Sequence, residues 1–264
     1  MEIICCIKQV PGTNKVEADA ETGVLLRSTA EAKLNPYDLY ALEAAFKLRE
    51  SIGGTVKVIT MGPPQAEAAV REAFAMRADS GVILSDKAFA GADVLATART
   101  LADGIKKSGS FDIIICGKQT TDGDTAQVGP ELAEFLDIPH IANVRIILGI
   151  EPSNTGHIRV EADMGDYIET FDVLLPCLIT VDKGAYVPRL PSYRLMLASA
   201  SREIPVLTAA DLPGESEMYG LKGSPTRVKR IYPPDAKNAR FNIGGSSESV
   251  ANSLLNELRN LKFI

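Results

Sequence analysis

The chain has no tryptophan, only two histidines and no CxxC pair, and each absence narrows its possible chemistry. Neither His140 nor His157 lies beside a nucleophile motif, so the sequence gives no sign of a hydrolase triad. The four cysteines lack the usual spacing of zinc or iron–sulfur ligands, and each lies in an apolar, strand-like run. We interpret them as buried, reduced thiols with a packing role, and we expect no metal site.

Basic charge and long apolar runs are also scarce. A net charge of -6 argues against sequence-independent binding of nucleic acid, which needs a basic face. No apolar run is long enough to span a bilayer, and the opening residues MEIICCIKQV lack the basic leader and long apolar part of a signal peptide. We therefore expect a soluble, cytoplasmic protein that binds no nucleic acid and has no membrane span.

Strand-like and helix-like segments alternate through the first half of the chain. The strands are expected at 2–7, 55–60, 81–84 and 113–116, with a hairpin at 16–27. The helices are expected to begin at Pro36 with Asn35 as N-cap, at Gln65, after the N-cap Asp93, and near Thr125. This alternation predicts an α/β fold with a doubly wound, mostly parallel sheet.

The pattern changes after residue 139. Four strand-like segments at 143–148, 157–161, 167–173 and 177–181 follow without helices between them, which predicts antiparallel edge strands. Residues 183–202 have no clean period, and their apolar content favours a loop that docks on another molecule. We predict an α/β nucleotide-binding domain at 1–202 and, at 203–264, a C-terminal arm. An amphipathic helix near 247–262 would pack on a partner subunit or fold back on its own domain.

The stretch 111–136 is the main candidate site, because it reads as strand, polar loop and helix in sequence. In open parallel sheets, ligands bind beyond the carboxyl ends of strands, and amides at a helix start suit phosphate. The loop is neither a Walker loop nor a GxGxxG turn, and many such loops bind nothing. Asp122 and Asp124 would repel phosphate, so a phosphate site would use backbone amides and threonine hydroxyls, while ribose hydroxyls could engage the carboxylates. The hydroxyls are those of Thr120, Thr121 and Thr125.

Several separated motifs then occur in one order along almost the entire chain. They are CIKQVP at 6–11, NPYD at 35–38 with ALEA at 41–44, GKQTTDGDTAQ at 117–127, PCLIT at 176–180 and PRLPS at 188–192. Together they resemble the β, or small, subunit of electron-transfer flavoproteins. This resemblance implies an adenine-nucleotide α-hydrolase-like sheet, with no catalytic side chains of the usual kind.

The resemblance also implies which residues form the nucleotide pocket. They are Cys6, Ile7, Lys8, Asn35, Pro36, Asp38, Met61, Gly62, Gly117, Lys118, Gln119, Asp122, Gly123, Asp124, Thr125, Ala126, Gln127 and Val128. In simple carriers of this family the pocket holds AMP, and in electron-bifurcating members it holds a second FAD that takes hydride from NADH. Residues 8–11, Asp38 in place of a cysteine, and residues 123–127 look like the bifurcating branch, so we expect FAD, with AMP as the alternative. Asp38 and Lys8 are candidates for tuning the flavin.

The resemblance implies two protein partners, a larger flavoprotein α subunit and a flavin dehydrogenase. The dehydrogenase would contact the recognition loop at 183–202. Its expected contact residues are Pro188, Arg189, Pro191, Tyr193, Leu195 and Met196. Family members often carry lysines after this loop, whereas this chain has Ala198-Ser199-Ala200-Ser201. That departure leaves both an acyl-CoA dehydrogenase and one for lactate open.

A rival of another class is an ATP-using enzyme of the adenine-nucleotide α-hydrolase-like group, which would share the sheet. The sequence has no Ser-Gly-Gly-x-Asp-Ser pyrophosphatase loop, which argues against this rival. We expect an electron-carrier subunit. Whether it has enzymatic activity, such as NADH oxidation within a complex, stays open at this point.

Overall fold

The computed structural model describes residues 1–12, 32–150, 156–229 and 242–264. The chain divides into two compact units, Met1–Lys229 and Arg230–Ile264, and each is described by itself. The hairpin predicted at 16–27 lies outside the described residues. Among the described helices, none combines the length and the apolar character that crossing a bilayer requires.

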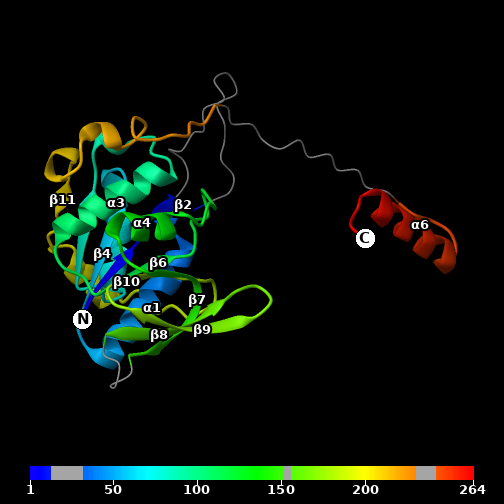
Figure 1. The fold of residues 1–264 in the computed structure, drawn as a ribbon, viewed down its shortest axis with the longest axis horizontal. Helices are drawn as coiled ribbons and strands as arrows, with labels where there is room; N and C mark the ends of the chain where they lie inside the picture. The colour runs from blue at the N-terminus through cyan, green and yellow to red at the C-terminus, as the bar shows by residue number, and fades with distance from the viewer. Residues whose placement is uncertain (13–31, 151–155, 230–241) are drawn as a thin grey trace. The chain divides into compact units, whose positions relative to one another are not determined.

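The first unit is built on a sheet that has nine strands within the described residues, in the order β11-β5-β4-β1-β6-β10-β7-β8-β9 (Figure 1). Pairing is parallel from β11 to β7 and antiparallel from β7 to β9. The strands of this sheet are β1 (Glu2–Cys6), β4 (Thr55–Met61), β5 (Ser80–Leu84), β6 (Ile113–Gly117), β7 (His140–Gly149), β8 (His157–Asp163), β9 (Ile168–Leu174), β10 (Cys177–Val181) and β11 (Val206–Leu207). A separate antiparallel pair joins β2 (Gln9–Pro11) to β3 (Ala32–Leu34).

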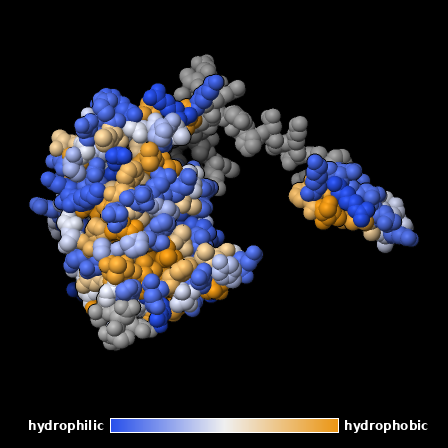
Figure 2. Space-filling view, in the orientation of Figure 1, coloured by the Kyte–Doolittle hydropathy of each residue, from blue (hydrophilic) through white to orange (hydrophobic). Residues whose placement is uncertain are grey.

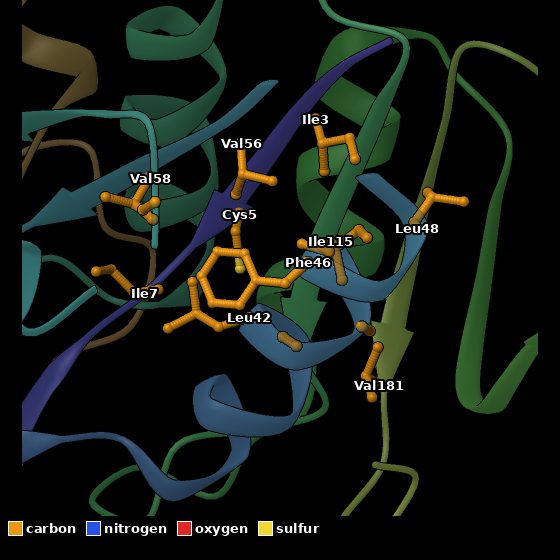
Figure 3. Packing of buried hydrophobic residues seen from close by; sticks show 14 of the residues in the cluster. Ile3, Cys5, Ile7, Leu42, Phe46, Leu48, Val56, Val58, Ile115 and Val181 are labelled. Atoms are coloured by element: carbon orange, nitrogen blue, oxygen red, sulfur yellow. The ribbon is translucent and has the colours of Figure 1, made fainter. Parts of the chain in front are cut away.

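Helices pack on both faces of the sheet, as the alternation of strands and helices predicts. On one face lie α1 (Pro36–Ile52) and α2 (Glu67–Ala75), and on the other α3 (Val94–Ser108) and α4 (Val128–Leu136), which lie side by side in Figure 1. Because side chains alternate along a strand, Cys5 packs with α1 while Cys6 packs with α3 and α4. Figure 3 shows Cys5 against Phe46 and Leu42 of α1. The predicted doubly wound, mostly parallel sheet is confirmed.

The antiparallel edge is also confirmed for β7, β8 and β9, but β10 does not belong to it. Strand β10 lies between β6 and β7 and is parallel to both, with Ile179 opposite Ile115. All five of its residues are buried, so it needs cover on both faces, and an interior position supplies that cover. Grouping 177–181 with the edge strands was therefore wrong.

The loop predicted at 183–202 contains a short helix, α5 (Tyr193–Ser199), which packs against α2. The Ser192 side chain accepts a hydrogen bond from the Leu195 amide at 3.5 Å, and the Ser192 amide donates to the Ala75 carbonyl at 2.9 Å. With only seven residues, the helix is too short for a helical period to be evident in the sequence.

Residues that follow 202 also belong to the first unit. Strand β11 extends the sheet beside β5, and the Tyr219 ring is fully buried, 5.6 Å from the Phe89 ring between centroids. Further along, the Thr226 amide and hydroxyl donate to Asp93 Oδ2 at 3.0 and 2.8 Å. The domain boundary predicted at residue 202 therefore falls inside a compact unit that continues to Lys229.

The described part of the second unit is dominated by α6 (Ser247–Asn260), whose N-cap Ser246 accepts from the Ser249 amide at 3.3 Å. Figure 2 shows apolar residues gathered on part of its surface, and Leu254, Leu255 and Leu261 are exposed. That this helix packs on a partner subunit stays a prediction.

Candidate nucleotide-binding site

The strand order places a topological switch point between β1 and β6. From β1 the chain moves outward to β4 and β5 on one side, and then returns to β6 and β10 on the other. In open α/β sheets, ligands bind beyond the carboxyl ends of the strands at such a point. The segments that leave these ends are Lys8 after β1, Met61 and Gly62 at the end of β4, and the loop 117–127 after β6. Most of the predicted pocket residues are thus brought to one edge of the sheet.

A buried carboxylate joins two of these segments to the start of α1. Asp38, in the first turn of α1, accepts hydrogen bonds from the Lys8 amide at 2.7 Å, from Asn35 Nδ2 at 2.8 Å and from the Gly117 amide. Burial raises the pKa of Asp38 to about 7, against the opposing effect of these hydrogen bonds. A Cβ at Gly117 would lie 2.4 Å from Asp38 Oδ1, so this approach of α1 to β6 requires glycine.

Asn35 occupies the predicted N-cap position of α1, and Pro36 follows at the first helical position. Within the described residues, however, the Asn35 side chain makes no capping bond. Its Nδ2 donates to the Gln119 carbonyl at 2.9 Å as well as to Asp38, and its Oδ1 accepts from the Thr121 amide at 3.2 Å. The predicted N-cap position is therefore right, but the side chain bonds to the loop 117–127 and to the Asp38 side chain and accepts no backbone amide of the helix.

Each of the two aspartates of this loop has a side-chain partner. Lys8 Nζ lies 2.9 and 2.7 Å from the two carboxylate oxygens of Asp122, and Gln119 Nε2 donates to Asp124 Oδ1 at 2.9 Å. Burial alone would raise the pKa of Asp122, but hydrogen bonds from Lys8 and Thr120 together lower it below its ordinary value. Lys8 therefore balances one of the two charges that, from the sequence, would repel phosphate.

The backbone between Asp124 and α4 is turned by two left-handed residues. Asp124 has a φ of 50° and Ala126 one of 55°, so the helix expected near Thr125 begins only at Val128. The amides of Val128 and Gly129 precede the first helical hydrogen bond, which runs from the Glu131 amide to the Gln127 carbonyl at 3.1 Å. Together with the exposed Thr125, these amides are the kind of donor that a phosphate group needs.

Met61 and Gly62 reach the same edge of the sheet through the pairing of β1 with β4, in which Cys6 lies opposite Ile59. The Gly62 amide already donates to the Leu84 carbonyl at 3.0 Å. Lys118 also lies at this edge, and its Nζ is 2.9 Å from Asp182 Oδ2 after β10. These three residues border the switch point.

The predicted partner-binding residues differ in exposure. Arg189 turns inward, and its guanidinium donates to Glu43 Oε2 at 2.8 Å, to Glu43 Oε1 at 3.0 Å and to Glu50 Oε1 at 2.8 Å. Tyr193 is 71% exposed and Met196 is 48% exposed, whereas Leu195 and Pro188 are half-buried and Pro191 is exposed. Three more exposed apolar residues lie on this surface and were not predicted from the sequence. The apolar run around two prolines could have indicated them. They are Val187, Leu190 and Leu197.

The described residues contain no group of three or more histidine, cysteine, aspartate or glutamate side chains that could bind a metal ion. The fold defines an α/β protein with a doubly wound sheet, and a polar loop lies at its switch point, where proteins of this class bind their ligands.

Comparison with known proteins identifies the family. The model of the electron transfer flavoprotein domain matches residues 22–212. The electron transfer flavoprotein subunit beta of Thermoanaerobacterium thermosaccharolyticum is 44% identical over 259 residues, covering 98% of both chains. The caffeyl-CoA reductase-Etf complex subunit CarD of Acetobacterium woodii is 41% identical over 261 residues, covering 98% of both, and the protein FixA of Azotobacter vinelandii is 38% identical over 258 residues, covering 96% of this chain and 92% of FixA.

The chain belongs to the electron transfer flavoprotein family, and the predicted resemblance to its β subunits is confirmed. Membership supports a role in electron transfer and a general association with flavin or AMP. Subunits of this kind pair with an α subunit.

Proposed function

We propose that this protein is the small subunit of a heterodimeric electron-transfer flavoprotein and that it binds FAD at the switch point between β1 and β6. The observation that carries the proposal is the loop 117–127, whose acidic residue Asp122 is neutralised by Lys8 and whose end presents the amides of α4. This arrangement suits a diphosphate. The amides of Val128 and Gly129 and the Thr125 hydroxyl can donate hydrogen bonds to it, and the charge of Asp122 is balanced by Lys8.

The residues at the switch point could bind a diphosphate-containing nucleotide, and the proposal needs no catalytic side chain. The amides of Val128 and Gly129 and the Thr125 hydroxyl would face the diphosphate, while Met61 and Gly62 would border the adenine. When bound, a flavin supplies one- and two-electron redox chemistry, and the protein contributes orientation and local charge. Lys8, just beyond the carboxyl end of β1, is a cation at this edge of the sheet.

FAD is favoured over AMP by the residues that resemble the bifurcating branch, residues 8–11, Asp38 and residues 123–127. One relative that is 41% identical is named as a subunit of a caffeyl-CoA reductase-Etf complex, which supports a role within a larger redox assembly. In the proposed complex, NADH is the hydride donor and electrons leave through a dehydrogenase of acyl-CoA or lactate type.

The exposed apolar residues at and before α5 support the proposed contact with the dehydrogenase. Leu190 is 88% exposed, Tyr193 71% and Leu197 60%, and apolar surface of this kind is typical of protein contacts. The exposed leucines of α6 would contact the α subunit. The second contact is consistent with the pairing of β subunits of this family with an α subunit.

Cofactor content tests the proposal directly. The heterodimer, purified with its α subunit, is denatured, and the released FAD and AMP are counted per heterodimer. Two FAD and no AMP would support the proposal, and one of each would support the simple carrier. Release of phosphate from ATP, without bound flavin, would favour the ATP-using enzyme.

Two variants test the position of the site. Thr125→Ala and Gln127→Ala should each lower the nucleotide content of the heterodimer, because they remove polar groups beside the amides of α4. Thr170→Ala, on the exposed strand β9, is the matched control and should leave the content unchanged. Unchanged content in both loop variants would contradict the assignment.

A further inference from the structure

Asn35 and Asp38 are among the least accessible residues of the candidate site. Asn35 is 0% exposed and Asp38 is 4% exposed, although both lie at the carboxyl edge of the sheet where the nucleotide is expected. Buried polar groups normally have hydrogen-bond partners, so the identity of those partners indicates what the two side chains do.

Their partners are all within the protein. Asn35 bonds to Asp38, to the Gln119 carbonyl and to the Thr121 amide, and Asp38 bonds to the amides of Lys8 and Gly117. The pair thus connects the end of β1, the start of α1 and the loop after β6. Both Nδ2 hydrogens of Asn35 are used in these bonds. The burial of the two side chains limits the access of a nucleotide to the acceptor sites that remain on them.

We propose that Asn35 and Asp38 are positioning residues, which orient the loop 117–127 for the nucleotide and do not contact the nucleotide themselves. This inference rests on the proposed nucleotide site, and it makes the orientation of the loop 117–127 depend on the buried pair. Both had been expected among the cofactor-binding residues, and Asp38 also as a group that tunes a flavin.

The proposal makes nucleotide affinity depend on pH in a particular direction. The three partners that the structure gives the Asp38 carboxylate are N–H donors. An ionised carboxylate accepts such bonds more strongly than a neutral carboxyl does, so protonation of Asp38 weakens its connections to Lys8, Asn35 and Gly117. Because burial raises the pKa of Asp38 to about 7, this protonation falls near neutral pH. Affinity for the nucleotide should therefore rise as pH increases through 7.

Charge repulsion alone would give the opposite sign, because an ionised Asp38 repels a phosphate more than a neutral one does. Among the described residues, Lys8, Cys5 and Cys116 interact electrostatically with Asp38, and Lys8 in turn pairs with Asp122. Lys8 is paired with Asp122, whose pKa is lowered, so that Asp122 stays ionised at neutral pH. Burial raises the pKa of the Cys5 thiol. A hydrogen bond with Cys6 and burial raise the pKa of the Cys116 thiol. Both thiols therefore stay neutral at neutral pH.

The test uses the heterodimer depleted of nucleotide in the proposed pocket and titrated with FAD between pH 5.5 and 8.5, a range in which the FAD diphosphate keeps its charge. Asp38→Asn keeps the shape of the side chain but cannot ionise, and its amide group opposes a donor. We expect FAD affinity about 10- to 100-fold weaker at pH 8.5, with no rise through pH 7. Asp172→Asn, at an exposed carboxylate on β9, is the matched control and should behave as wild type.

Asn35→Ser separates positioning from titration. It removes the bonds to the Gln119 carbonyl and the Thr121 amide, so affinity should fall. It also removes the bond to Asp38 that lowers the pKa of that carboxyl, so the rise in affinity should be kept but move to higher pH. An Asp38→Asn variant with wild-type affinity, or one that is weaker but keeps the wild-type pH dependence, would overturn the proposal.

Hydrogen exchange without nucleotide distinguishes this inference from the proposed function. The amides of Gly117 and Thr121 should exchange faster in Asp38→Asn than in wild type, while amides in β9 should exchange at equal rates. If wild type binds neither FAD nor AMP, the proposed function fails, and this comparison still decides whether the pair orders the loop. Equal exchange at residues 117–121 in the two proteins would refute the positioning role.

Discussion

The ion pair between Arg189 and Glu43 gives a prediction that can be worked out from the structure. Glu43 lies in α1 and its side chain is 3% exposed, while Arg189 precedes α5 and its side chain is 19% exposed. Glu43 accepts the Arg189 backbone amide at 3.0 Å as well as two bonds from the guanidinium, which also lies 4.8 Å from the centre of the Phe46 ring.

Arg189→Met keeps the apolar stem of the side chain but leaves the Glu43 carboxylate buried without its counter-charge. Removing one partner of a buried ion pair costs about 3–5 kcal/mol of unfolding free energy. For a compact unit of this size, each kcal/mol shifts the Tm by about 2–4 °C, so we expect Tm to fall by about 6–20 °C. Because the chain has no tryptophan, circular dichroism is the suitable probe, with urea unfolding as the second measurement.

Two further variants make the reasoning refutable. Arg159→Met disrupts an ion pair with Asp172 that is also two-pronged but exposed, and such pairs contribute about 1 kcal/mol or less. Arg189→Met combined with Glu43→Met removes the isolated charge, so the double variant should regain most of the lost stability. Equal losses for Arg189→Met and Arg159→Met, or a double variant less stable than Arg189→Met alone, would refute the account.

Two other predictions concern stability. Tyr219→Phe should lower the unfolding free energy by about 1–3 kcal/mol, since the hydroxyl donates to Asp103 Oδ2 at 2.7 Å and accepts from the Gly214 amide at 2.9 Å. The exposed Tyr193→Phe should change the urea midpoint little, and equal midpoints for both variants would contradict this. For Asp38, the folded pKa of about 7 lies above the ordinary 3.8, so the unfolded chain loses its proton first and stability falls as pH rises between these values, by about 4 kcal/mol. Asp38→Asn should abolish that slope in urea unfolding between pH 4 and 7, and an unchanged slope would count against Asp38 as its source.

Predictions from local sequence were the ones that the structure confirmed best. The strand predicted at 2–7 implies that Cys5 and Cys6 lie on opposite faces of the sheet, because neighbouring side chains in a strand diverge, and the structure has them so. Asp93 caps α3 as expected, with its Oδ1 accepting from the Ala96 amide at 3.1 Å. The position of the loop 117–127 after a buried strand likewise indicated the edge of the sheet at which the candidate site lies.

The partners of the polar residues depended on the tertiary structure. Asn35 was expected to cap its own helix, but it bonds to Gln119, 84 positions away. Lys8 and Asp122 are separated by 114 positions, and Arg189 and Glu43 by 146. No periodicity or capping rule reaches such separations, so the sequence alone could not show that these charges are balanced.

The amino-acid sequence by itself determined most of the longer strands and helices and which of their faces are apolar, because these depend on residues a few positions apart. Only the tertiary structure decided that β10 enters the sheet between β6 and β7, and that residues up to 229 belong to the first unit. The order of strands brings Asp38, Asn35 and Gly117 together, and that proximity, more than the identity of any one residue, forms the candidate site.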